Sequence, residues 1–391
     1  MLWVVEAWRG VASALVVWAH WAAPLGLPMG FTAFAFTGVD LFFVLSGFVF
    51  APVLLQRPVP SLRAYALRRV LRIYPAYLAA LALYVALAWM AGRPLVYLPE
   101  HVLMAHLQTR EMAFYYNPAF WSLPVEVEFY LLVPALGFWL ARERGPACAA
   151  VAHQDGGTRA KQRRWRWAWV LTMALMLRLG LAFWAATAAQ NLAYVLLNHV
   201  PGMLLEFLLG AWVWQRAQQP APRTKTWPLA VAGLTGWCTL ATLFVQSPPS
   251  MAWHGSLLGL GAAACFAAML WASCYLPAPG ARLAAVAQWG GRLSYSVYLL
   301  HIAWLAPALA WSARWGTGAG TLLALAGLLA SCLALHWLIE EPEQVGLGVA
   351  FTIGVLADLV FGGLLGEQAM RLVVMAFILD RFRARMRFFP L

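Results

Sequence analysis

The sequence predicts an all-α membrane protein, a polytopic helix bundle with ten transmembrane helices. Two observations predict this fold class. Of the 391 residues, 63% are hydrophobic and only 11% are charged, a composition that a soluble domain does not have. The apolar residues also fall into stretches of roughly 20, the helix length that crosses a bilayer.

Ten stretches are long enough to span a membrane. They lie at 4–24, 31–56, 70–91, 119–141, 167–189, 199–215, 227–246, 255–276, 293–311 and 319–339. The segment 95–118 is expected to hold a short interfacial helix over the bundle. The N-terminus lacks a basic region before its first apolar stretch, so we expect no cleaved signal peptide.

The basic residues predict that both the N-terminus and the end of the tenth span lie in the cytoplasm. With that orientation, seventeen Lys and Arg fall in 57–72, 142–166, 216–225 and 277–292, and three fall in the opposite loops. The net charge of +12 then faces anionic lipid headgroups, so membrane lipids are expected partners and nucleic acid is not. The expected location is a bacterial cytoplasmic membrane.

The five cysteines are scattered and have no CxxC spacing. They predict neither a disulfide framework nor a metal site. Function must therefore be sought among the ionisable residues of the spans.

The first span carries Arg9 and His20 within "WRGVASALVVWAHW". Eleven residues are close to three helical turns, so both side chains lie on one face, about 16 Å apart. Ionisable groups at membrane depth usually face a cavity or a partner because burying them in lipid is costly. The alternative is an arginine that extends to the interface and a histidine hydrogen-bonded to a neighbouring helix.

Acidic residues mark the second and fourth spans. Asp40 and Ser46 occur in "GVDLFFVLSGF", and Glu126 and Glu128 occur in "WSLPVEVEFYLLVP". Residues two apart on a helix do not share a face. We therefore expect one glutamate to face a cavity and the other to face the headgroup region.

Three further features belong to the same pattern. Arg69 and Arg72 in "RRVLRIYP" share a face and suit a phosphate ligand, although ordinary cytoplasmic charge explains them equally well. Ser294, Tyr298 and His301 form a polar stripe in "GRLSYSVYLLHIAW", a pattern that interhelical hydrogen bonding also produces. Arg178 is the only charged residue of the fifth span. It is expected to be either a ligand in a cavity or the partner of a carboxylate, and the sequence does not choose between the two.

The five quoted motifs, in their order and spacing along residues 1–343 of the chain, resemble the integral-membrane acyltransferase-3 family. The resemblance implies transfer of a short acyl group, often acetyl, from cytoplasmic acyl-coenzyme A to a hydroxyl of a glycan or lipid-linked sugar. Acyl-coenzyme A is then a donor substrate, and no permanently bound cofactor is expected.

The resemblance also implies roles for the residues. His20 matches the catalytic histidine, Arg9 its companion, and Glu126 the glutamate of the fourth motif, whereas Glu128 falls where the family is not usually acidic. Arg69 and Arg72 match the pair that engages the phosphates of coenzyme A. We expect three further residues in the donor site: Ser46, Tyr298 and His301.

A histidine base suits this chemistry because a neutral imidazole accepts a proton near neutral pH. A carboxylate from Asp40 or Glu126 is expected to orient the ring, and the sequence does not choose between them. The competing class is a proton-coupled transporter or glycan flippase, which uses similar intramembrane residues. Such carriers usually have paired repeats, and this chain has none that we detect.

The last part of the chain departs from this pattern. From about residue 345 to 391 it resembles a fragment of MreD, the rod-shape-determining membrane protein. The resemblance predicts two units, a ten-helix acyltransferase domain at 1–343 and an MreD-like extension at 344–391. We expect this anomalous hydrophobic extension to be a fused gene end without a function of its own.

Overall fold

Helices are the only regular secondary structure of the computed structural model over the residues that it describes, which are 2–28, 30–55, 61–141, 156–187, 190–220, 225–247 and 254–340. The elements of the first half are α1 (Leu2–Trp21), η1 (Gly30–Thr37), α2 (Gly38–Leu55), α3 (Leu62–Met90), α4 (Leu98–Val102), α5 (Arg110–Phe114), η2 (Pro118–Trp121), α6 (Ser122–Ala141) and α8 (Gly156–Thr187). Those of the second half are α9 (Gln190–Leu197), α10 (Val200–Ala217), α11 (Trp227–Gln246), α12 (His254–Ser273), α13 (Ala281–Leu300), α14 (Leu305–Trp315), α15 (Thr317–Leu335) and a π-helical turn, η3 (His336–Glu340). The predicted extension at 344–391 lies outside the described residues.

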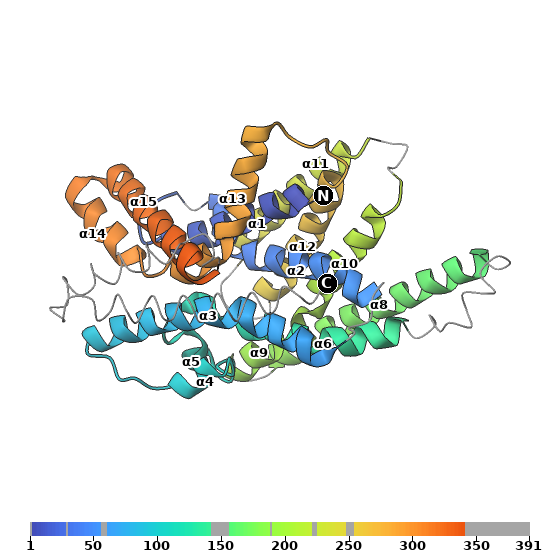
Figure 1. Cartoon of the computed structure of the whole chain (residues 1–391), viewed down its shortest axis with the longest axis horizontal. Helices are drawn as coiled ribbons and strands as arrows, with labels where there is room; N and C mark the ends of the chain where they lie inside the picture. The colour runs from blue at the N-terminus through green and yellow to red at the C-terminus, as the bar shows by residue number, and fades with distance from the viewer. Residues whose placement is uncertain are drawn as a thin grey trace.

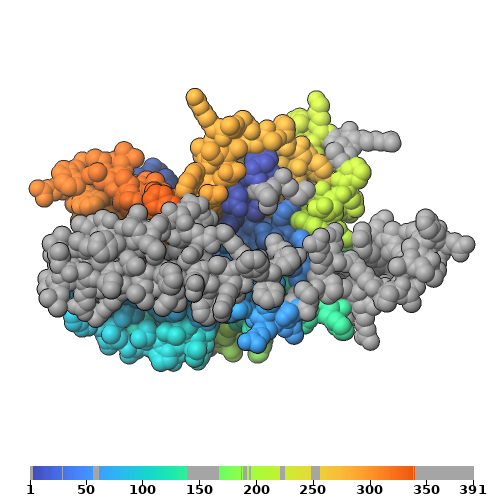
Figure 2. Space-filling view, viewed as in Figure 1, coloured from blue at the N-terminus to red at the C-terminus, as the bar shows by residue number. Residues whose placement is uncertain are grey.

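The helices form an elongated bundle in which α3 runs along one long edge (Figure 1). Helices α14 and α15 lie at one end of the molecule, and α8 lies at the other. The same arrangement is visible in the space-filling view, where α14 and α15 stand at one end and the blue and cyan atoms of α3 to α5 line the lower edge (Figure 2).

Eight helical segments of the described chain are long and apolar enough to cross a membrane, or nine if one bent pair counts as a span. The chain is therefore an integral membrane protein. The predicted span 293–311 is wrong as a straight helix, because α13 begins at Ala281 and the pair α13–α14 bends by 88°. The predicted span 4–24 is not among the eight; α1, which occupies most of it, contains Glu6, Arg9 and four tryptophans.

The predicted interfacial helix over the bundle is replaced by two short helices, α4 and α5, and the 3-10 turn η2. Tyr77 of α3 holds this segment by donating its hydroxyl hydrogen to the carbonyl oxygen of His101, and Tyr116 donates to Val96. The first bond joins the segment to the middle of α3, and the second holds the segment together.

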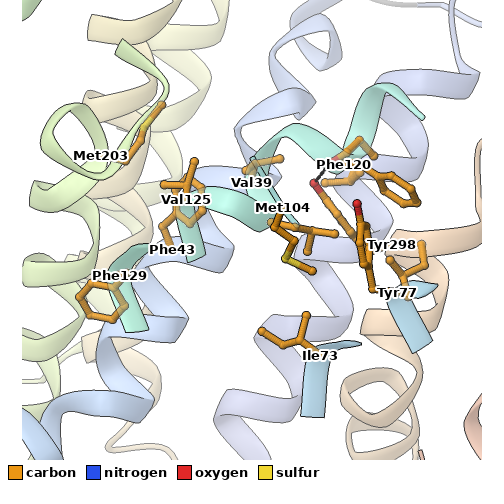
Figure 3. Packing of buried hydrophobic residues seen from close by; sticks show 14 of the residues in the cluster. Val39, Phe43, Ile73, Tyr77, Met104, Phe120, Val125, Phe129, Met203 and Tyr298 are labelled. Carbon is orange, nitrogen blue, oxygen red and sulfur yellow. Dashed lines mark hydrogen bonds between the residues drawn. The ribbon is translucent and has the colours of Figure 1, made fainter. Parts of the chain in front are cut away.

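The core of the bundle is built on α2, α6 and α10. The rings of Phe129 and Phe207 stack with their centres 3.9 Å apart, and Phe43 packs on Phe207 at 4.9 Å. Figure 3 shows Phe43 and Phe129 on one side of this cluster, and Tyr77, Phe120 and Tyr298 gathered on the other. Large apolar side chains on the outer faces of α8, α11 and α15 are exposed, as lipid-facing side chains are.

Helices α2 and α10 touch through their backbones. A Cβ atom on Gly47 would collide with the carbonyl group of Phe207, and one on Gly210 would collide with that of Val44. Small residues permit such close packing of membrane helices. Because both ends of the contact are backbone, neither helix can yield without moving as a whole.

We predict that Gly47→Ala destabilises the protein by about 1–3 kcal/mol or more, because an added methyl group overpacks this contact. The measurement is the thermal unfolding midpoint of the purified protein in detergent. Gly180→Ala is the matched control, since nothing lies within 4 Å of the position of its Cβ. Equal midpoints for the two variants would contradict the prediction.

Candidate active site

A cavity of about 130 Å³ lies between α1, α2, α3, α6 and α13. The helices come from both ends of the chain, so only the fold brings their polar side chains together. Six of the nine predicted site residues line it: Arg9, Ser46, Arg69, Arg72, Glu126 and Tyr298. Ser294, the first residue of the predicted polar stripe, lines it as well.

The cavity has an excess of positive charge. Three arginines and one glutamate line it, and within the described part of the chain no carboxylate forms an ion pair with Arg69 or Arg72. Arg9 lies 3.8 Å from Glu6 and within electrostatic range of Arg72 and Glu126. Guanidinium groups without anionic partners favour an anionic ligand.

Arg69 is held in place by aromatic rings. Its guanidinium carbon lies 5.0 Å from the ring centre of Phe50 and near those of Tyr65 and Tyr130. Its Nε atom is buried and has no hydrogen-bond partner among the described residues. Arg69 also lines a second, apolar cavity of about 690 Å³ between α3 and α6, so it forms part of the wall between the two.

Glu126 anchors the polar side of the cavity. Its Oε1 atom accepts a hydrogen bond from Ser46 at 3.0 Å and another from the hydroxyl of Tyr130. Tyr130 is one turn along the same helix, and the sequence interpretation missed it although the i, i+4 spacing was visible. Two hydroxyl donors thus hold Glu126 in place, within electrostatic range of Arg9.

Tyr298 closes the cavity from α13. Its hydroxyl donates to the carbonyl oxygen of Ala119, so the hydroxyl of Ser122, 2.5 Å away, donates to Tyr298. Figure 3 shows the Tyr298 side chain extending toward Phe120. These bonds tie α13 to η2 and α6.

His20 does not line the cavity and lies near the end of α1, beside His301. His301 Nε2 is 3.2 Å from His20 Nδ1, and the two ring centres are 5.0 Å apart. Helices α1 and α13 also touch at Gly10 and Gly290. Since contacts ten or eleven residues apart recur on both helices, α1 and α13 run parallel.

His301 joins the histidine pair to the cavity, because its ring centre is 6.2 Å from that of Tyr298, which lines the cavity. Arg9, which lines the cavity, and His20, which lies beside His301, are therefore on the same helix. The helical rise places the two residues about 16 Å apart.

Asp40 belongs to a different cluster. It is buried within electrostatic range of Arg178 and Glu206, and Arg178 forms an ion pair with Glu206 at 3.3 Å. No hydrogen bond joins Asp40 or Glu126 to His20 within the described chain, so neither predicted carboxylate orients that ring in this structure. Of the two alternatives for Arg178, the structure supports the partner of a carboxylate.

Glu206 was missed in the sequence, although a lone carboxylate in "VPGMLLEFLLG" is the type of signal that marked the others. Arg178 also donates to backbone carbonyls of Gly202 and Ser256. The cluster joins α8 to α10 and α12.

Glu128 does not line the cavity and lies at the start of α10. It accepts a hydrogen bond from the backbone of Val200, the first residue of α10, and lies 2.5 Å from His199. A carboxylate is favourable at a helix N-terminus, where backbone N–H groups lack partners. Glu128 is therefore a structural cap of α10.

These features define a multi-span membrane enzyme with a cationic cavity and a histidine pair. Residues 3–341 match the family model described as an acyltransferase domain, and the chain belongs to this family, acyltransferase-3. The protein is thus an acyltransferase. This confirms the family predicted from the five motifs.

Residues 301–390 match a second family model, the rod shape-determining protein MreD. This match begins about forty residues earlier than the predicted boundary and overlaps the acyltransferase match over 301–341. No curated protein and no solved structure matches the chain.

Proposed function

We propose that this acyltransferase moves an acetyl group from acetyl-coenzyme A to a hydroxyl of a glycan or a lipid-linked sugar, with His20 as the base. The observation that supports this most is the contact between His301 of the His20–His301 pair and Tyr298, which lines the cavity together with Arg69 and Arg72. This contact joins an anion site, formed by the two arginines, to a proton acceptor.

The donor is proposed to bind through its phosphates to Arg69 and Arg72. A cavity of about 130 Å³ is too small for a nucleotide, since an engineered cavity of about 150 Å³ holds a molecule of the size of benzene. It suits the narrow chain that links the phosphates of coenzyme A to the thioester. The nucleotide would then stay outside the cavity, and the thioester would extend along α1 toward His20.

The transfer step follows from this placement. The acceptor hydroxyl gives its proton to His20 as its oxygen attacks the thioester carbonyl carbon. A C–O bond forms, the C–S bond breaks, and the coenzyme A thiolate leaves and takes up a proton. Arg9, Glu126 and Ser46 are proposed to hold the donor arm, and Tyr298 to line its path.

The proposal places the donor on the cytoplasmic side of a bacterial inner membrane and the acceptor on the opposite side. The bias of basic residues supports this orientation, because the arginines of α3 lie at the end that the charge rule assigns to the cytoplasm. His20, three turns further along α1, then lies near the outer surface.

The test is an assay of the purified protein in liposomes with acetyl-coenzyme A labelled in the acetyl group. The enzyme should release free coenzyme A and transfer label to an added glycan or to water. A transporter or flippase would move its cargo without breaking the thioester, and intact donor would overturn the proposal. Analysis of cell-surface glycans for lost O-acetyl groups after gene deletion would identify the acceptor.

We also propose that residues 1–343 suffice for transfer and that 344–391 have no role in it. Truncation after Pro342 should leave kcat and the donor KM unchanged, because every residue placed in the site precedes it. The matched control is the full-length chain purified in the same detergent. A monodisperse truncated protein without transferase activity would contradict this prediction.

A further inference from the structure

We propose that His301 is a positioning residue for His20, in the place that a carboxylate occupies in a catalytic triad. The inference rests on the proposed function, in which His20 is the base. His301 is fully buried, whereas His20 is partly exposed, and their nearest nitrogens are 3.2 Å apart. The buried His301 ring thus contacts the accessible His20 ring, in the way that an orienting group contacts a catalytic base.

The hydrogen bonds of His301 assign its tautomer. Its Nδ1 atom lies 2.9 Å from the carbonyl oxygen of Tyr298 and 3.1 Å from that of Val297. Carbonyl oxygens only accept, so Nδ1 carries the hydrogen, and Nε2 of the neutral ring keeps a lone pair. His301 therefore presents an acceptor to His20.

The break between α13 and α14 frees the carbonyl groups to which the His301 ring is hydrogen-bonded. Carbonyl groups in the last turn of a helix lack partners within the helix and need donors from elsewhere. Tyr84 and Asn117 both donate to the carbonyl oxygen of Leu299. Trp21 donates to the carbonyl oxygen of His301, and the His301 ring donates to that of Tyr298. The 88° bend thus fixes the orientation of the His301 ring.

The same reasoning assigns the tautomer of His20. Its Nδ1 atom lies 2.9 Å from the carbonyl oxygen of Val16 and 3.2 Å from the His301 acceptor. Both neighbours accept, so Nδ1 carries the hydrogen and shares it between them. The Nε2 atom of His20 is then the nitrogen that has a free lone pair and takes the proton of the acceptor hydroxyl.

His301 holds the ring and does not take the proton itself. A charged imidazolium at a fully buried position without a carboxylate beside it would be costly, and no ion pair with His301 exists among the described residues. The charge therefore stays on His20, which lies in the last turn of α1. A cation is favourable there because the C-terminal end of a helix carries partial negative charge.

The experiment compares His301→Leu, which removes the acceptor, with His301→Gln, whose amide oxygen keeps one. We expect His301→Leu to lower kcat by about tenfold or more, as loss of an orienting group does, and to leave the donor KM unchanged. His301→Gln should restore most of kcat. In His301→Leu, the acidic limb of the pH profile of kcat should move to lower pH, because the charged form of His20 loses an acceptor.

The double variant His20→Gln with His301→Leu tests whether His301 acts through His20. We expect it to be about as slow as His20→Gln alone, since residues that act as a unit are not additive. Additive losses would overturn the inference, as would a His301→Leu enzyme with wild-type kcat and pH profile. Gel filtration in detergent establishes that each variant is folded.

The two proposals fail in different ways. An active His20→Gln enzyme would overturn the base and, with it, the positioning role. An inactive His20→Gln enzyme together with a fully active His301→Leu enzyme would overturn only the positioning role. A loss of activity in His301→Leu that glutamine does not restore, with an unchanged pH profile, would make His301 a packing residue and contradict the inference.

Discussion

Replacement of His20 by glutamine is expected to lower kcat by about 10²–10⁴-fold, the range for loss of a general base. Glutamine fills a similar space and still offers a donor to Val16, but its amide does not accept a proton. Donor binding should be nearly normal, since the cavity residues lie about three turns away along α1. The measurement is kcat with acetyl-coenzyme A, together with a direct binding assay for coenzyme A.

His199→Gln is the matched control for this variant. His199 pairs with Glu128 at the start of α10 and does not line the cavity, so its replacement should leave kcat near the wild-type value. A His20→Gln enzyme that retains more than about a tenth of wild-type turnover would contradict a base that contributes at least the expected hundredfold. If His20 only forms a hydrogen bond to a neighbouring helix, the His20→Gln enzyme should retain most of its turnover.

The candidate site could be assembled from the sequence to a large extent because ionisable residues are rare in membrane helices. Each of Arg9, Arg72 and Glu126 stands out against an apolar background, and the helical period indicates which of them share a face. The structure adds that they face one cavity. The two-residue spacing predicted that Glu126 and Glu128 face different directions, but not which of them faces the cavity. The structure shows that Glu126 does.

Pairings between distant helices could not be predicted from one sequence. Asp40 and Arg178 are 138 positions apart, and only the packing of α2 and α8 against α10 brings them together around Glu206. The residues next to a carboxylate in the sequence do not show whether it orients a catalytic side chain or belongs to a buried ion pair. In our proposal, His301, which the sequence analysis placed in the donor site, takes the place of the predicted carboxylate behind His20.

The bend after α13 was missed for a similar reason. The stretch 293–311 is apolar enough to be one span, and Pro307 is the only proline in it. The break occurs at 301–304, where Tyr84 and Asn117 from other elements satisfy the freed carbonyl group of Leu299. A helix can end where tertiary donors replace its own hydrogen bonds, and such donors are not visible in the local sequence.

The joint replacement of Arg69 and Arg72 by methionine is expected to raise the donor KM by about tenfold or more, with a much smaller effect on kcat. A hydrogen bond to a charged group contributes roughly 1.5–3 kcal/mol, and about 1.4 kcal/mol corresponds to a factor of ten. Methionine keeps an unbranched apolar stem, which matters at Arg69 because this side chain separates the polar cavity from the apolar one. Alanine there would also merge the two cavities.

The control is the double lysine variant, which keeps both charges and loses the forked geometry. If the arginines bind phosphate, the KM of the lysine enzyme should lie between those of the wild-type and methionine enzymes, and the wild-type KM should rise with salt concentration. The competing explanation is that both arginines serve only to orient the protein in the membrane. An unchanged KM in a methionine variant that inserts in the opposite orientation would support that alternative and remove the phosphate site, because the charges of α3 would then act on topology alone.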